Sequence, residues 1–177
     1  MILKCDIINK QGVRRLFNIG DTVVYGAQGV CKIDTVQEKQ IGKQAIKYYV
    51  LKPVFNENTS VFVPIENAVL TAKMQSILTL SQAKELINEV PNIKILKNTD
   101  ESHKRELYKN TIASGDHKAL ISLIKTIVAE RERRREAGKK LNMNDEQTLC
   151  KAETLLYSEL AIVYGVELGE AKNLIKF

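Results

Sequence analysis

Two glycines in the stretch "NIGDTVVYGAQGVCKI" are the first residues whose spacing could serve chemistry, namely the binding of a phosphate group. A phosphate-binding loop needs a helix directly after its glycines, because the free N–H groups and the dipole of that helix hold the anion. Here Gly26 and Gly29 are followed by the β-branched run "VCKIDTV", without a GK[ST] ending. The sequence therefore predicts a corner between two strands, where glycine permits a positive φ, and not a nucleotide site.

The residue types used for acid–base, nucleophilic and metal chemistry are sparse and scattered. The two histidines, His103 and His117, lie in different polar segments, and there is no HExxH motif. Cys5, Cys31 and Cys150 form no CxxC pair, which argues against a zinc cluster or a disulfide framework and favours reduced thiols. With no GxSxG motif either, we expect no catalytic residue, metal ligand, cofactor or small-molecule substrate, and hence no enzyme.

The most concentrated charge in the chain is the tract "ERERRREAGKK" at residues 130–140. Its cations are Arg131, Arg133, Arg134, Arg135, Lys139 and Lys140. One explanation is a solvated helix end, where i, i+4 neighbours such as Glu132 and Glu136 are like-charged and form no salt bridge. Another is that arginines are favoured at the carboxyl end of a helix because the helix dipole is negative there. The cations can equally form a salt-sensitive patch that contacts nucleic-acid phosphates. His103, Lys104 and Arg105 would extend such a patch.

Adjacent aromatics in the first half raise the question of a protein interface. Tyr48 and Tyr49 lie within an apolar run, and strand alternation sends them to opposite faces. The one outside the core is an interface candidate, since edge strands can pair with a strand of a partner. For either tyrosine, an ordinary place in the core of the β module explains the aromatic side chain equally well.

Composition places these residues in one or two globular domains. The chain has 177 residues, of which 44% are hydrophobic and 27% charged. Its net charge of +6 weakly favours an acidic partner such as nucleic acid. Because no apolar run resembles a secretion signal or a membrane span, we expect a cytoplasmic protein without a membrane partner.

The apolar pattern changes its period near residues 70–78. Residues 22–70 contain short runs rich in Val, Ile, Tyr and Phe, which predict about five strands in a small curled sheet or SH3-like barrel. Pro64 marks an edge or an end of that sheet. Helical spacing follows at residues 81–90, 102–112, 116–128 and 142–160, with Ser81, Ser102 and Asn142 as capping residues. We therefore expect an α+β protein with a β domain at 1–72, including an extension at 1–16, and an all-α bundle at 73–177.

Several stretches together resemble a known family. "FNIGDTVVYGAQGVCKI", "KYYVLKP" and "SVFVPIENA", followed by "YKNTIASGDHKALISLIKTI" and "KAETLLYSELA", resemble the CarD/CdnL family of bacterial transcription regulators. The resemblance implies a Tudor-like module that docks on the β subunit of RNA polymerase, as does the related module of the transcription-repair coupling factor. It also implies a helical domain that contacts promoter DNA near the upstream edge of the transcription bubble. Such proteins modulate open-complex stability without chemistry.

Some positions that the family uses for binding keep the expected residue type in this sequence, and others do not. It places the polymerase contacts at Lys39, which keeps a basic charge, and at Phe62, where some relatives are basic; Tyr49 is a further candidate. Many relatives insert a Trp into the DNA minor groove, but Glu101 occupies that position here, and the chain has no Trp. We therefore expect a nucleoid-associated regulator whose DNA binding is phosphate-dominated, through the basic residues named above.

Two other functions fit the same residues. A protein-interaction module could bind polymerase without strong DNA contact, which the acidic Glu101 favours. A Tudor-like RNA-binding protein would share the basic charge and would stack single-stranded bases on its aromatics.

Overall fold

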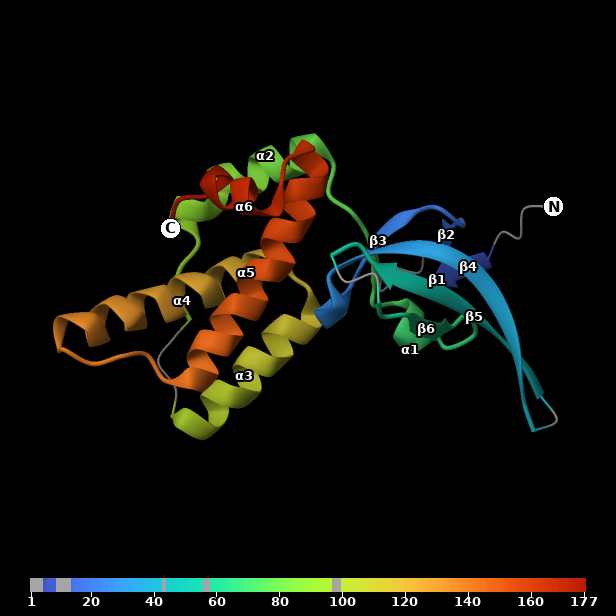
Figure 1. Ribbon diagram of the computed structural model, residues 1–177, viewed down its shortest axis with the longest axis horizontal. Coiled ribbons are helices and arrows are strands. Elements are labelled where there is room, and N and C mark those ends of the chain that lie inside the picture. Colours follow the sequence, from blue (N-terminus) through green and yellow to red (C-terminus); the bar gives the residue numbers. More distant parts are fainter. Residues whose placement is uncertain (1–4, 9–13, 43, 56–57, 97–99) are drawn as a thin grey trace. The chain divides into compact units, whose positions relative to one another are not determined.

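The computed structural model describes residues 5–8, 14–42, 44–55, 58–96 and 100–177, and it divides into two compact units (Figure 1). The sheet unit spans residues 1–77 and the helical unit spans residues 78–177. The predicted α+β architecture is confirmed, with the division five residues later than the predicted boundary after residue 72. The reason is a last short strand, β7 (Met74–Ser76), which pairs with β3 and so belongs to the sheet unit.

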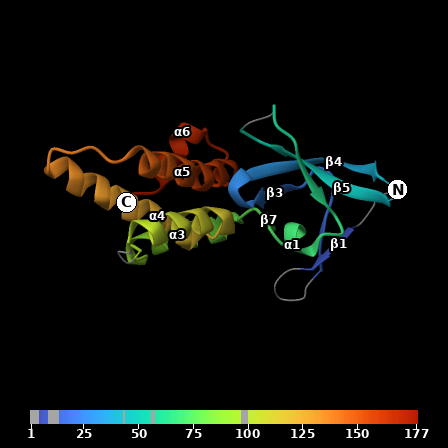
Figure 2. The same ribbon diagram turned by 90° about the horizontal axis from the view of Figure 1, so that it is seen from below.

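The sheet unit is built on five antiparallel strands in the order β6-β5-β4-β3-β7 (Figures 1 and 2). Besides β7, the strands are β3 (Thr22–Tyr25), β4 (Val30–Ile41), β5 (Gln44–Pro53) and β6 (Val61–Pro64). As predicted from Pro64, β6 is an edge strand that ends at this residue. A short helix, α1 (Ala68–Thr71), separates β6 from β7.

Part of the predicted amino-terminal extension forms a separate hairpin. Strand β1 (Cys5–Ile8) pairs antiparallel with β2 (Arg14–Phe17), and both lie outside the five-stranded sheet.

The glycine pair of the opening motif lies at a corner between β3 and β4. Gly26 and Gly29 have φ values of 45° and 72°, and residues 26–28 form one 3₁₀ turn, η1 (Gly26–Gln28). The N–H of Tyr25 donates to the carbonyl of Gly29 at 2.9 Å, which closes the turn. The prediction of a strand corner is confirmed, since β4 and not a helix follows.

The helical unit contains α2 (Leu80–Glu89), α3 (Glu101–Ser114), α4 (His117–Glu136), α5 (Met143–Tyr164) and α6 (Leu168–Ala171). Two short 3₁₀ turns, η2 (Val90–Asn92) and η3 (Lys172–Leu174), follow α2 and α6. Buried apolar residues of α4 and α5, such as Ile124 and Leu156, form the centre of its core. No helix of the described residues is both long and apolar enough to cross a membrane.

The capping residue agrees with prediction at one helix and differs at two others. Asn142 caps α5 as predicted, and Asp116 caps α4 at the predicted start of that helix. The predicted caps Ser81 and Ser102 are wrong. Thr79 instead caps α2 in a capping box with Gln82, and Asp100 caps α3 through the N–H of His103. Each observed cap is a polar residue two positions before the predicted one, and a periodic pattern alone does not distinguish two such polar residues.

Candidate functional site

The outer face of the sheet carries a cluster of one cation and two aromatic rings. Lys39 on β4, Tyr48 on β5 and Phe62 on β6 share this face. On β5, the alternate residues Ile46, Tyr48 and Val50 lie on one side of the sheet. The strand register places Lys39 opposite Ile46 and Phe62 opposite Val50, and hence on the same side as Tyr48. The Nζ atom of Lys39 lies 3.6 Å from the centre of the Phe62 ring. The Tyr48 and Phe62 rings meet edge to face, 6.4 Å apart. We call these three residues the Lys39–Tyr48–Phe62 cluster.

The cluster is open to a partner. The side chain of Phe62 is 41% exposed, and Lys39 is also exposed. A cation over an exposed aromatic ring keeps both groups at the surface in a fixed arrangement. The structure thus brings together Lys39 and Phe62, two residues that the sequence predicts as polymerase contacts. It adds Tyr48, which the sequence analysis left open as an interface candidate together with Tyr49.

Tyr49, the third residue predicted as a polymerase contact, does not lie on this face. It is 1% exposed and belongs to the core of the sheet unit with Leu51, Val63 and Met74. Its side chain is directed inward because Tyr49 pairs with Val36 on β4 and with Val63 on β6. A side chain buried in this way cannot touch a partner of the folded protein, so its assignment as a contact is wrong.

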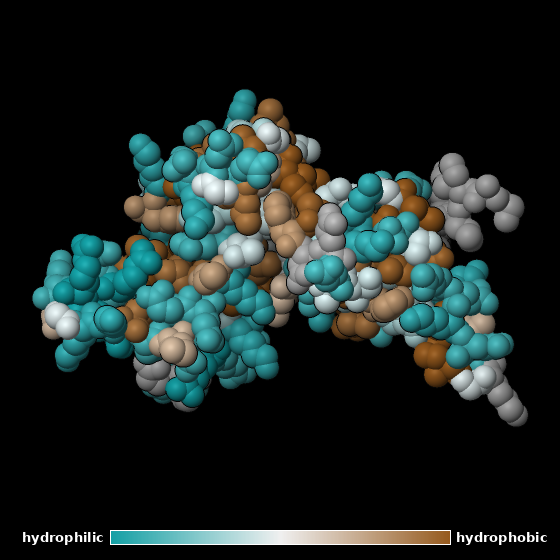
Figure 3. Space-filling model, in the orientation of Figure 1, coloured by the Kyte–Doolittle hydropathy of each residue, from teal (hydrophilic) through white to brown (hydrophobic). Residues whose placement is uncertain are grey.

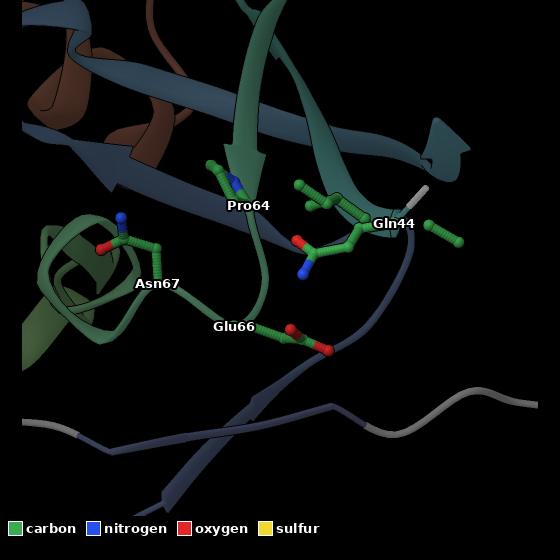
Figure 4. Close-up of a pocket in the computed structure, with 6 residues that line it drawn as sticks. Gln44, Pro64, Glu66 and Asn67 are labelled. Atoms are coloured by element: carbon green, nitrogen blue, oxygen red, sulfur yellow. The ribbon is translucent and has the colours of Figure 1, made fainter. Parts of the chain in front are cut away.

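Beside the cluster, a groove follows the edge of β5. Strand β6 stops at Pro64, opposite Tyr48, whereas β5 continues to Gln44. Among the described residues, no strand pairs with this edge at Gln44–Ile46. The groove is lined by Gln44, Ala45, Ile46, Pro64, Glu66 and Asn67 (Figure 4). Open backbone groups at a strand edge can receive an extended segment of another protein.

The predicted basic residues at the start of α3 have different surroundings. His103 is exposed, and its Nδ1 lies 2.5 Å from Oδ1 of Asp100. Arg105 is exposed as well. Lys104, in contrast, is an internal residue of the helical unit, since its Nζ lies 2.7 Å from Oδ2 of Asp145 and the two side chains are 16% and 8% exposed.

The Lys104–Asp145 ion pair belongs to the capping structure of α5. The side-chain amide of Asn142 donates to the same oxygen of Asp145 at 2.8 Å, and the N–H of Asp145 donates to Asn142 Oδ1 at 2.8 Å. Lys104 therefore holds α3 against the first turn of α5, and its charge is compensated. Its prediction as a DNA-phosphate contact is not supported by this geometry.

Carboxylates in the tract 130–140 hold three of its arginines. Arg133 makes two hydrogen bonds to Glu130, of 2.8 and 2.9 Å, and Arg134 reaches Glu130 at 2.6 Å. Arg135 pairs with Glu132 at 2.5 Å. The hydrogen bonds from Arg133 and then Arg134 lower the pKa of Glu130 to about 2. The explanation of a helix end without salt bridges is thus wrong, because opposite charges meet at i, i+3 and i, i+4.

Three cations of the tract have no such partner among the described residues. Arg131 is half-buried, and Lys139 and Lys140 are exposed beyond the end of α4. Backbone bonds from Gly138 to Arg135 and from Lys139 to Arg134, of 3.0 and 2.8 Å, close the helix end. The surface at this end of α4 is hydrophilic (Figure 3). These cations are the best placed of the tract for a phosphate contact.

Two further residues with chemistry-bearing side chains, His117 and Cys31, lie in different units. His117 lies in the first turn of α4, with its Nε2 2.6 Å from Oε2 of Glu159. Cys31 is a buried thiol whose pKa burial raises to about 11. Within the described part of the chain, no three His, Cys, Asp or Glu side chains could hold a metal ion together.

Comparisons with known proteins match both units. Residues 17–78 match the family model of the CarD-like/TRCF RID domain, and residues 85–176 match the model of the CarD C-terminal domain. The chain is also similar to a protein of Bacillus subtilis (strain 168) named "Putative transcription factor YdeB". The two are 20% identical over 158 residues, which cover 89% of this chain and 99% of that protein.

Proposed function

We propose that this chain, which belongs to the CarD family of RNA polymerase-interacting transcription regulators, binds the polymerase β subunit through the Lys39–Tyr48–Phe62 cluster. We further propose that its helical unit contacts upstream promoter DNA, so that the protein changes the stability of the open complex in the cytoplasm. Regulators of this family are not enzymes.

The observation that carries the proposal is the exposed cluster beside an open strand edge. A cation stacked on an aromatic ring, with a second ring against it, offers both charge and apolar area to a partner. The edge of β5 at Gln44–Ile46 can add main-chain hydrogen bonds next to it. Both features lie on the unit whose family model is named for the RID domain.

Exchanging both ends of the cation–aromatic pair should weaken polymerase binding. For the double variant Lys39→Glu/Phe62→Ala we expect a loss of about 30-fold in affinity for the isolated amino-terminal lobe of the β subunit, the size of one interface hot spot. A titration by calorimetry measures it. Lys73→Glu/Phe55→Ala is the matched control, since it changes an exposed cation and an exposed phenylalanine elsewhere on the sheet unit. Equal affinities of the two double variants would place the docking surface elsewhere.

The DNA half of the proposal rests on the cations that have no carboxylate partner among the described residues. Within the part of the chain that the structure describes, Arg131, Lys139 and Lys140 have no ion pair to break before they neutralise phosphates, unlike the arginines held by Glu130 and Glu132. The second candidate function is polymerase binding with little DNA contact. It is favoured by the compensation of Lys104 by Asp145.

The salt dependence of DNA binding separates these two functions. If the three cations contact phosphates, Arg131→Gln/Lys139→Gln/Lys140→Gln should reduce the slope of log affinity against log salt by about 2 to 3, close to 0.9 for each contact. Fluorescence anisotropy on an upstream promoter duplex measures the slope. The control Lys84→Gln/Lys94→Gln/Lys172→Gln removes three exposed cations from other parts of the same unit. If the two triple variants have the same slope, or if the wild type binds no DNA, then polymerase binding with little DNA contact is the better-supported function.

A further inference from the structure

Glu159 of α5 is a buried carboxylate that holds two other segments of the helical unit. Its side chain is 2% exposed, and both of its oxygens are used. Oε1 accepts the backbone N–H of Leu78 at 2.8 Å, and Oε2 lies 2.6 Å from Nε2 of His117. The carboxylate thereby joins α5, the first turn of α4 and the first residue of the helical unit.

Leu78 occupies a special place in the chain, because it follows directly on the boundary between the units. Only residues 77–79 separate the end of β7 from the start of α2. Thr79 is already fixed by the capping box of α2. With the N–H of Leu78 bound to Glu159, Ile77 is the one residue of this connection that neither anchor holds. Release of Leu78 would lengthen the free connection between the units.

The stability of this anchor depends on a charge that can be titrated. A buried carboxylate is costly unless a positive partner compensates it, and here the partner is the imidazole of His117. Burial alone would lower the pKa of His117, but the hydrogen bond and charge of Glu159, with the charge of Asp116, outweigh it and raise the pKa above 6.5. On the α2 side, the neighbouring Lys118 is paired with Glu89 at 2.6 Å, at the surface.

We propose that His117 and Glu159 form a pH-responsive clamp on Leu78, which shortens the connection between the units while His117 is protonated and lengthens it when the proton is lost. Its consequence for transcription rests on the proposed function, since the connection joins the polymerase-binding unit to the DNA-contacting unit. The clamp itself is a property of the free protein.

The direction of the pH effect follows from the raised pKa. A histidine that is more easily protonated in the folded state contributes its full stabilisation below its unfolded pKa, near 6.5, and loses it as the pH rises through the folded value. Above that value the buried carboxylate faces a neutral ring. Water then competes for Glu159 and opens its bond to Leu78.

Nuclear magnetic resonance of the full chain between pH 5.5 and 9 tests the clamp. The titration of His117 is followed on its ring resonances, and the protection factor of the Leu78 amide is followed by hydrogen exchange. We expect the protection factor to fall at least tenfold, with the same midpoint as the titration of His117. Polymerase binding is measured separately, so a failure of the proposed function leaves this result intact.

Two variants make the outcome specific. His117→Gln keeps a hydrogen-bond donor without a titratable charge, and it should abolish the pH step at Leu78. His103→Gln removes the other histidine, which is exposed on α3, and should leave the step in place. A Leu78 protection factor that does not change as His117 titrates would overturn the proposal, and so would a step that survives in His117→Gln. If His117→Gln does not fold, the titrations of the wild type and of His103→Gln decide.

Discussion

Replacing Asp145 with alanine should lower the free energy of unfolding of the helical unit by about 3 kcal/mol, because it removes the buried carboxylate that pairs with the largely buried ammonium of Lys104. The same change removes an acceptor of Asn142 at the first turn of α5. A loss of this size should lower the melting temperature of a unit of this length by about 15 °C. Urea titrations followed on resonances of α3 and α5 give the free energy for the helical unit alone.

The pair, and not either residue by itself, should account for that cost. Lys104→Met removes the cation that pairs with the buried Asp145 carboxylate, so we expect a loss of similar size. In Lys104→Met/Asp145→Leu the buried charges are gone, and the loss should be clearly smaller than the sum of the two single losses. Lys118→Met is the matched control, since it breaks an exposed ion pair with Glu89 and should change stability by less than about 0.5 kcal/mol. Additive losses would mean that Lys104 and Asp145 contribute independently.

The sequence predicts those parts of the helical unit that depend on neighbours along the chain. Asn142 was identifiable as the cap of α5 because its side-chain oxygen accepts the N–H of Asp145, which lies within the same turn. Lys104 and Asp145 are 41 positions apart, and nothing local marks them as partners. Their contact depends on the packing of α3 against α5, which periodicity does not specify. For this reason a basic residue near a predicted DNA surface proved to be an internal one.

The same limit applies to the three predicted polymerase contacts, of which Lys39 and Phe62 lie together on the outer face and Tyr49 is buried. Alternation predicts that Tyr48 and Tyr49 face opposite ways, and the structure confirms this. Which of them is buried depends on how β4 and β6 pair with β5 on its two sides, which the residues of β5 alone do not specify. Lys39 and Phe62 meet across three strands, and only the family resemblance, not the residues alone, suggested that both serve one surface.

Adjacent tyrosines on β5 should therefore give opposite results when each is replaced with alanine. Tyr49→Ala empties a fully buried site and should destabilise the sheet unit by about 3 to 5 kcal/mol. Tyr48→Ala removes a half-buried ring from the outer face, where its contact with Phe62 contributes about 1 kcal/mol. Hydrogen exchange of the β4 and β5 amides reports the stability of the sheet unit, and exchange in α5 serves as an internal reference.

The same two variants should also differ in polymerase binding, because Tyr48 is a proposed contact and Tyr49 is a core residue. Tyr48→Ala should weaken binding to the β-subunit lobe by about tenfold while the sheet stays folded, as expected for one interface side chain. Tyr49→Ala should weaken binding only as far as it unfolds the sheet unit, so the loss should shrink when the titration is repeated at lower temperature, where more of the variant is folded. If folded Tyr49→Ala binds weakly and Tyr48→Ala binds normally, then the inner face of β5 becomes exposed in the complex and the assignment of the outer face fails.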